Sequence, residues 1–284
     1  MSSALLVAAL SVACGSGNET TGPSPLPAPN STIVYTALGA SDVLGIGGSV
    51  ACAPWDDCAG GRGYVQVAGR ELRSRGFTVN VHPLGVPGAV LSRRILVLGQ
   101  RYRSDLLTNI MEQEVPFILP TTTLVTIFAG GNDVNALTSA IGGGAAGADR
   151  NGFINSQIAA FGQDFAALIA AIRQRVPSAR IVVLNLPNQG GMPYLTNAAR
   201  DHRLAAQMLS VGFTRDVLNP LVASDITVID LMCDARAYQV STYSADGFHP
   251  SDTGYAWLAA EVVSAATTAY RRPSTSCAQM SIVQ

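Results

Sequence analysis

The sequence contains no lysine, and only 13% of its 284 residues carry a charge. Its 18 basic residues are therefore all arginines, and no run of them is longer than two. With a formal net charge of -1, the chain offers no basic stripe on which a nucleic-acid backbone could bind. This composition excludes nucleic acid as a partner.

The sequence also lacks a hydrophobic run long enough to span a membrane. Its first apolar stretch, residues 5–13, has the length of a signal-peptide core and ends at Cys14. Residues 10–14 resemble a bacterial lipobox, in which the cysteine receives diacylglycerol and becomes the mature amino terminus. We therefore expect residues 1–14 to be a signal peptide and Cys14 to be lipidated. An ordinary cleaved signal followed by an incidental cysteine is the alternative.

The rest of the chain divides into a linker and one domain. Residues 15–30 are rich in Gly, Ser, Thr and Pro, and they have too little apolar content to pack. Residues 31–284 suit a single domain, which at this size buries roughly three quarters of its unfolded surface. We expect an exported monomer of the cell envelope, either secreted or in contact with the membrane only through a lipid anchor.

Cysteine is limited to five residues, and four remain if Cys14 carries lipid. An even number is expected in an oxidising compartment. A bond from Cys52 to Cys58 would close a short loop, and one from Cys233 to Cys277 would fasten the carboxyl-terminal segment. A zinc site is the alternative, but neither pair has the CxxC spacing that favours one.

From residue 32 onward, short β-branched runs alternate with longer helical patterns, which is typical of βαβ units and a parallel sheet. We predict a three-layer α/β/α sandwich whose five-stranded parallel sheet has the order 2-1-3-4-5. The expected strands are 32–38, 77–82, 122–128, 180–186 and 226–231. The expected helices are 62–75, 89–103, 154–174, 195–219 and 252–270, the last capped by Ser251 or Asp252. The glycine-rich segment 141–147 is either a flap near the site or a plain linker.

The first strand ends in a small-residue turn that presents Ser41. In parallel α/β sheets, chemistry collects at the carboxyl ends of the strands. A serine needs a base to remove its proton and a third group to orient that base. The chain has three histidines. His202 lies in a helical pattern, and His82 closes the second strand without a local acidic neighbour. His249 follows Asp246 by three residues, so the carboxylate can reach its ring within one turn.

An acyl-transfer site also needs fixed hydrogen-bond donors for the oxyanion. The candidates are the backbone N–H groups of Ser41 and Gly88 and the side-chain amide of Asn132. With strand order 2-1-3-4-5 these three loops meet. Asp246 and His249 must cross about 14 Å from the fifth strand. The fourteen residues after Leu231 can span that distance at ~3.3 Å each.

Four blocks of the sequence resemble the motifs of the SGNH (GDSL-type) hydrolases. They are, in order, residues 39–41 (Gly-Ala-Ser), 85–88 (Gly-Val-Pro-Gly), 130–133 (Gly-Gly-Asn-Asp) and 246–249 (Asp-Gly-Phe-His). The resemblance implies Ser41 as nucleophile, His249 as base oriented by Asp246, and Ser41, Gly88 and Asn132 as oxyanion donors. One position departs from the pattern, because the family usually has Asp directly before the serine and this chain has Ala40.

We therefore expect hydrolysis of a small-molecule, lipid or glycan ester through an acyl-enzyme, without a metal or organic cofactor. Two alternatives stay open, acyl transfer by the same residues and a surface binding module without turnover. Asp42 and Asp133 could also suggest a carboxylate metal site, but no further ligand accompanies them. We expect the substrate pocket to be lined by the loops after Asp42, at 105–120, after Asp133 and at 188–194.

Overall fold

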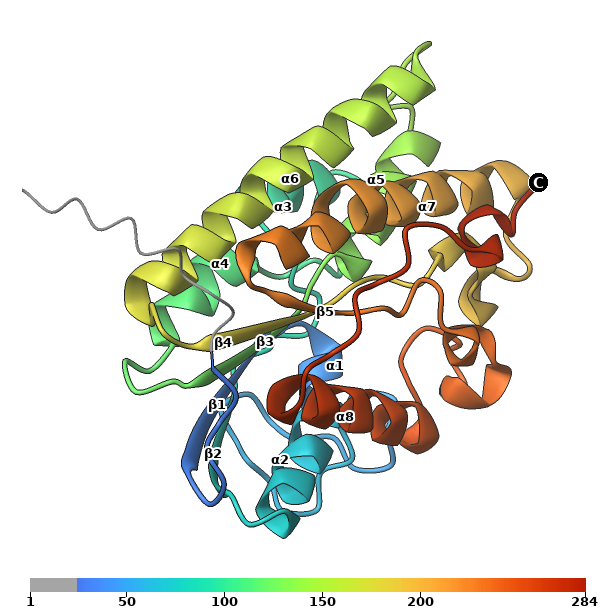
Figure 1. Cartoon of the computed structure of the whole chain (residues 1–284). Coiled ribbons are helices and arrows are strands. Elements are labelled where there is room, and N and C mark those ends of the chain that lie inside the picture. The colour runs from blue at the N-terminus through green and yellow to red at the C-terminus, as the bar shows by residue number, and fades with distance from the viewer. Residues whose placement is uncertain (1–24) are drawn as a thin grey trace, which may run out of the picture.

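The computed structural model describes residues 25–284, so the predicted signal peptide, Cys14 and most of the linker lie outside it. Its centre is a five-stranded parallel sheet with the order β2-β1-β3-β4-β5, which confirms the predicted topology (Figure 1). The strands are β1 (Thr32–Gly39), β2 (Thr78–Pro83), β3 (Leu124–Phe128), β4 (Arg180–Leu184) and β5 (Thr227–Ile229).

Helices cover both faces of this sheet (Figure 1). They are α1 (Ser41–Leu44), α2 (Tyr64–Ser74), α3 (Arg93–Gly99), α4 (Ile110–Gln113), α5 (Gly131–Gly142), α6 (Arg150–Arg175), α7 (Arg200–Gly212) and α8 (Asp252–Thr267). Side chains of α1, α2 and α8 pack on one face, and those of α3 to α7 pack on the other. In the part of the chain that the structure describes, no helix is both long and apolar enough to cross a membrane.

The strands are buried on both faces because successive side chains point to opposite sides of the sheet. In β4, Ile181 and Val183 belong to the core beneath α6, while Val182 and Leu184 belong to the core beneath α8. This alternation explains why the strands read as continuous apolar runs rather than alternating ones.

Two predicted helices are shorter than expected. The helix predicted at 89–103 is limited to α3, because Val90 pairs with Asn109 in a bridge and the preceding residues form turns at the end of β2. The helix predicted at 195–219 begins only at Arg200 and passes into a π-helical turn at Phe213–Leu218. Pro220, which has no N–H to donate, follows in a 3₁₀ turn. The last helix is capped by Ser251, whose hydroxyl accepts from Gly254 N–H.

The glycine-rich segment 141–147 joins α5 to α6. None of its residues is among those that line the pocket beside Ser41, and Figure 1 shows the connection at the end of α6 away from the sheet. Of the two interpretations, a linker fits this position and a flap over the site does not.

Both predicted disulfides are present, Cys52–Cys58 and Cys233–Cys277. The second ties the segment after β5 to the carboxyl-terminal tail, which also hydrogen-bonds through Val283 N–H and C=O to Gln207. A zinc site from the same four cysteines is therefore ruled out in this fold.

Removing the Cys233–Cys277 bond should cost more stability than removing Cys52–Cys58. The two bonds close sequence separations of 44 and 6 residues. On the loop-entropy argument, the double serine variants should lose up to about 4 and about 2 kcal/mol of unfolding free energy, respectively. Urea denaturation of the two variants beside the wild type measures this. Equal losses, or a larger loss at Cys52–Cys58, would contradict the loop-length argument.

Candidate active site

Ser41 lies directly after β1, as the first residue of α1, and only 5% of it is exposed. The turn that presents it requires Gly39, which has φ +153° and pairs with Phe128 of β3. A Cβ atom at Gly39 would lie 2.5 Å from the carbonyl oxygen of Phe128. The strand end therefore packs closely against its neighbour, and the serine hydroxyl emerges at the carboxyl edge of the sheet.

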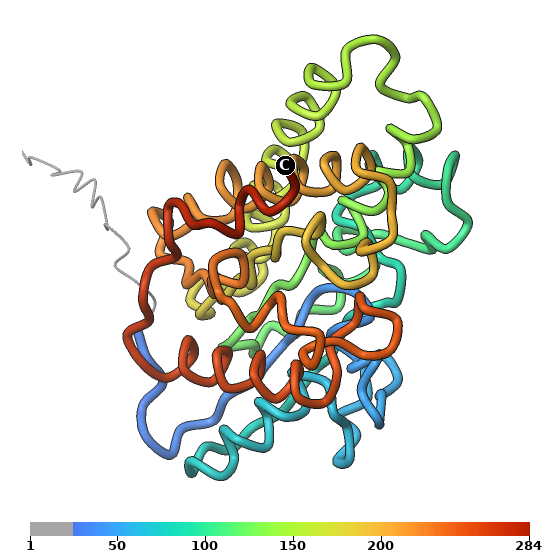
Figure 2. The backbone as a smooth tube through the Cα atoms, turned by 90° about the vertical axis from the view of Figure 1, so that its right-hand side faces the viewer, coloured from blue at the N-terminus to red at the C-terminus, as the bar shows by residue number. Residues whose placement is uncertain are grey.

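His249 reaches Ser41 from the other end of the chain. The Nε2 atom of His249 lies 2.8 Å from Ser41 Oγ, and its Nδ1 atom lies 2.6 Å from Asp246 Oδ2. The loop that carries both residues lies beside the segment after β1, as Figure 2 shows, and a Cβ atom at Gly47 would lie 2.6 Å from His249 Cβ. The structure thus brings together the three residues of the predicted triad in hydrogen-bonding geometry.

Asp246 is held by its own turn as well as by the histidine. Its Oδ1 accepts from the backbone N–H groups of Phe248 and His249 at 2.8 and 2.9 Å. Burial alone would raise the pKa of Asp246, but these N–H donors and His249 outweigh it and lower the pKa to about 2. The carboxylate therefore stays ionised at neutral pH, where it keeps a proton on Nδ1 and leaves the lone pair of Nε2 facing the serine.

The predicted oxyanion donors lie on loops that contact one another. Asn132 is near the start of α5, and its side-chain amide donates one hydrogen bond to Ala89 C=O at 2.9 Å. Within residues 25–284 its second N–H has no protein acceptor. Gly88 precedes Ala89 and has φ +76°, a conformation that favours glycine. A Cβ atom at Gly85 would lie 2.5 Å from Ala40 C=O, so the loop after β2 also touches the serine turn.

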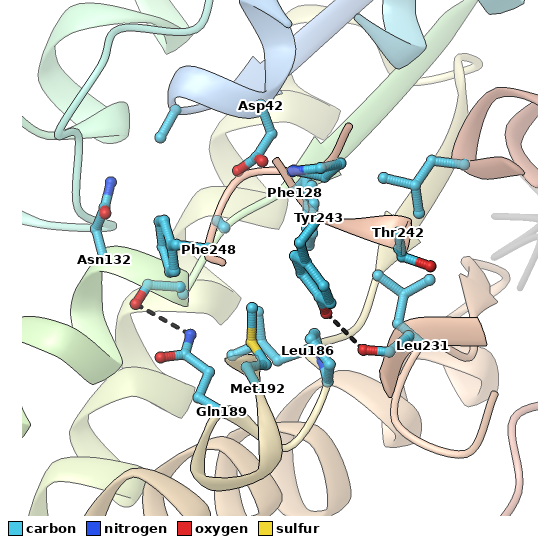
Figure 3. Close-up of a pocket in the computed structure, with 18 of the residues that line it drawn as sticks. Asp42, Phe128, Asn132, Leu186, Gln189, Met192, Leu231, Thr242, Tyr243 and Phe248 are labelled. Atoms are coloured by element: carbon cyan, nitrogen blue, oxygen red, sulfur yellow. Dashed lines mark hydrogen bonds between the residues drawn. The ribbon is translucent and has the colours of Figure 1, made fainter. Parts of the chain in front are cut away.

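A pocket lies at the carboxyl edge of the sheet (Figure 3). Its lining includes Ala40 and Asp42, the two neighbours of Ser41, but neither Ser41 nor His249. Most of its lining is apolar. The lining side chains come from the ends of β1, β3, β4 and β5 and from the loop before α8, and include Phe128, Leu186, Met192, Leu231, Tyr243 and Phe248. Asn132 and Gln189 are among the few polar groups. Such a lining suits an apolar group of a substrate.

Two features of this pocket differ from expectation. Of the four segments expected to line it, only 188–194 does so, through Gln189 and Met192, whereas the loops after Asp42, at 105–120 and after Asp133 do not. The segment after β5, including Ala237, Thr242 and Tyr243, does line it. The sequence predicts only that this segment spans the distance from β5 to His249, because its lack of periodicity does not indicate that it lines a pocket.

Asp42 is a further residue of the site. Its carboxylate points into the pocket in Figure 3, and Tyr255 OH lies 3.5 Å from its Oδ1. Burial raises the pKa of Asp42, and the nearby His249 opposes that shift. His82 and His202 lie elsewhere: His82 is on edge strand β2 and His202 is on α7, and neither lines the pocket.

Asp133 is fully buried and fixes the loop after β2. The backbone N–H of Leu91 donates to both of its carboxylate oxygens, with N···O distances of 3.0 and 3.2 Å. Because burial outweighs this hydrogen bond, the pKa of Asp133 rises to about 7. Asp133 therefore links α5, which carries Asn132, to the loop that carries Gly88 through its hydrogen bond with Leu91. No cluster of three metal-ligating side chains includes it among the residues that the structure describes.

The raised pKa of Asp133 predicts a loss of stability as the pH rises. Its folded pKa of about 7 lies above the ordinary value of 3.8, so its contribution is present below pH 4 and is lost as the pH passes 7. The full effect is at most roughly 4 kcal/mol. Compared with wild type, Asp133→Asn should therefore lose less unfolding free energy between pH 5 and 8. Parallel pH curves from urea denaturation would contradict this, and Asp201→Asn, on the exposed face of α7, is the control.

Comparison with known proteins places this geometry in a family. The model of the GDSL-like lipase/acylhydrolase family matches residues 46–257, which include Gly88, Asn132, Asp246 and His249 and begin just after Ser41. No match was found among curated proteins.

One solved structure is similar in fold, and two others are reported beside it for comparison. The lipase Lip_vut3 from a goat rumen metagenome aligns with a TM-score of 0.57 and 20% identity, over 83% of this chain and 98% of that one. A family two carbohydrate esterase from Clostridium thermocellum aligns with a TM-score of 0.48 and 16% identity, over 86% of this chain and 65% of that one. An extracellular lipase from Streptomyces rimosus aligns with a TM-score of 0.47 and 19% identity, over 83% of this chain and 100% of that one. Since the family model covers most of the chain, the protein belongs to the GDSL-like lipase/acylhydrolase family and is an ester hydrolase of the GDSL type.

Proposed function

We propose that this protein hydrolyses carboxylic esters through an acyl-enzyme on Ser41. The observation that carries the proposal is the continuous hydrogen-bonded series from Asp246 Oδ2 through the imidazole of His249 to Ser41 Oγ, with distances of 2.6 and 2.8 Å. This is the arrangement that a serine nucleophile requires, a base within reach and a carboxylate that orients the base.

In the first half of the reaction, His249 Nε2 takes the proton of Ser41 as Oγ bonds to the ester carbonyl carbon. The carbonyl oxygen becomes an oxyanion, for which the donors are the N–H groups of Ser41 and Gly88 and the free amide N–H of Asn132. The intermediate then collapses, the bond to the alcohol oxygen breaks, and His249 returns the proton to that oxygen. The alcohol leaves and an acyl group stays on Ser41.

In the second half, water enters where the alcohol left. His249 Nε2 removes a proton from the water as its oxygen attacks the acyl carbon, and the same donors hold the second oxyanion. Collapse of this intermediate returns the proton to Ser41 Oγ and releases the carboxylic acid. Asp246 remains ionised throughout and stabilises the imidazolium that forms in each half.

The pocket supports a substrate with an apolar portion. Leu186, Met192, Leu231 and Phe248 line it beside Ser41, and an aliphatic or aromatic group bound there would be removed from water. The substrate that we propose is therefore an ester whose acyl or alcohol part is apolar.

Covalent labelling tests this assignment of the nucleophile. A fluorophosphonate should add once to the folded protein, and the adduct should map to the peptide that contains Ser41, because among residues 25–284 Ser41 is the serine whose hydroxyl is hydrogen-bonded to a histidine ring. Intact-mass and peptide mass spectrometry measure the number and the place of adducts. Urea-unfolded protein, in which His249 is no longer adjacent, is the control and should stay unlabelled. A label on another serine, or none on the folded protein, would refute the proposal and would favour a binding module without turnover.

A further inference from the structure

Glu114 is a buried carboxyl outside the predicted site. It follows α4 directly and has no exposed surface. Among residues 25–284 no arginine or histidine forms an ion pair with it. Its Oε2 accepts from the N–H of Gly39 at 2.8 Å, and its Oε1 has no partner. Burying such a group costs stability unless its hydrogen bonds compensate. Its presence therefore calls for a role beyond packing.

The groups around Glu114 belong to the two loops that carry the oxyanion donors. Gly39 lies two residues before Ser41, and Val86 lies two residues before Gly88. Burial raises the pKa of Glu114 well above its usual range, and the backbone N–H groups of Gly39 and Val86 both oppose that shift. The carboxyl thus bonds to the serine turn at Gly39, next to the place where the carbonyl of Ala40 contacts the loop after β2 at Gly85.

The serine turn has no side chain of its own to perform this task. Ala40 precedes α1 and makes no side-chain hydrogen bond to the helix start. An acidic residue at this position, usual in the family that the sequence resembles, could have bonded to the turn. Here the acceptor comes instead from a segment more than seventy residues later, since Glu114 and Gly39 are 75 residues apart.

We propose that Glu114 is a positioning residue that fixes the backbone of the Ser41 turn by accepting a hydrogen bond from the N–H of Gly39. The inference rests on the proposed function, because the turn that Glu114 fixes carries the nucleophile and one oxyanion donor, the N–H of Ser41. The role depends on an acceptor oxygen at the right reach and does not depend on a negative charge.

Two substitutions separate the effect of the length of the Glu114 side chain from the effect of its charge. Glu114→Gln keeps the side-chain length and an acceptor oxygen but cannot ionise, so its kcat for p-nitrophenyl butyrate should stay within about 5-fold of wild type. Glu114→Asp keeps the carboxyl but withdraws it by one methylene. A misplacement of about 1 Å at a reacting centre can cost on the order of 100-fold, so we expect kcat to fall by about 10-fold to 100-fold. KM should change by less than about 3-fold in both variants, because the substrate pocket is intact.

A control residue lies two positions before Glu114, on α4. Glu112 lies on α4 with 43% of its side chain exposed, so Glu112→Gln and Glu112→Asp should both match wild type. Activities are compared per folded molecule, from circular dichroism and thermal melts at the assay temperature. The proposal is overturned if Glu114→Asp keeps wild-type kcat, if Glu114→Gln falls as far as Glu114→Asp, or if both losses follow the unfolded fraction. If wild type and Ser41→Ala have the same activity, the proposed function fails instead, whatever the Glu114 variants do.

Discussion

Replacing Ser41 with alanine should lower kcat/KM for p-nitrophenyl acetate by at least about 10⁴-fold. The hydroxyl is the group that lies within hydrogen-bonding distance of His249 Nε2, at 2.8 Å, and no acyl-enzyme forms without it. In serine hydrolases, loss of one triad member leaves only the roughly 10³–10⁴-fold catalysis over water that the oxyanion hole and binding supply. The variant should fold normally, because removing this hydroxyl leaves no buried group unpaired except His249 Nε2.

Steady-state hydrolysis at several enzyme concentrations measures this effect. Ser156→Ala is a suitable control, because Ser156 is exposed on α6 and bonds only to Phe153 C=O. Equal activity of wild type and Ser41→Ala would end the ester-hydrolase mechanism proposed for this site. It would leave the protein as a family member that binds without turnover.

Replacing Asp246 with asparagine should lower kcat by about 10²-fold to 10⁴-fold, with a smaller effect on stability. The asparagine carbonyl can still accept from the N–H groups of Phe248 and His249, so the turn is retained. Its amide would instead donate to His249 Nδ1, which moves the ring proton to Nε2 and removes the lone pair that must take the serine proton. Because 48% of the Asp246 side chain is exposed, water can partly replace it, hence the wide range.

The pH profile separates this explanation from a packing effect. The pKa of Asp246 is lowered to about 2, so the wild-type carboxylate is ionised at every pH from 5 to 9, and the loss in Asp246→Asn should be similar across that range. Asp216→Asn, in an exposed ion pair with Arg215, should behave as wild type. A variant that recovers full activity at any pH in this range would contradict the orienting role.

The sheet could be predicted from the sequence because each strand is a β-branched run bounded by turn residues. Strand order followed from the fold class, and the structure has it. The ends of the helices were harder to predict than the strands. Residues 89–92, in the loop after β2, have a helical composition. Val90 nevertheless pairs with Asn109 in a bridge, and the N–H of Leu91 donates to Asp133. A long-range partner overrides local propensity there, and no local pattern reveals such a partner.

The sequence identified some residues of the site more directly than others. The pairing of Asp246 with His249 could be predicted from the sequence, because the two residues are only three positions apart. Ser41, Gly88 and Asn132 could be placed at strand ends, where the parallel topology brings the loops together. Glu114 gave no signal, because its segment lacks periodicity and its partner is a backbone N–H, a group that almost every residue possesses. Contacts of that kind appear only when the chain is folded.

The distance along the chain between Ser41 and His249, 208 residues, has a consequence for how activity arises during folding. Contacts between remote segments form late, because closing so long a loop is entropically costly until the intervening structure exists. A chain with only β1 to β3 in place holds its serine and its amide donors but has no base. Partly folded molecules should therefore be inert toward esters, and recovery of turnover on refolding should report the docking of the last loop rather than formation of the sheet.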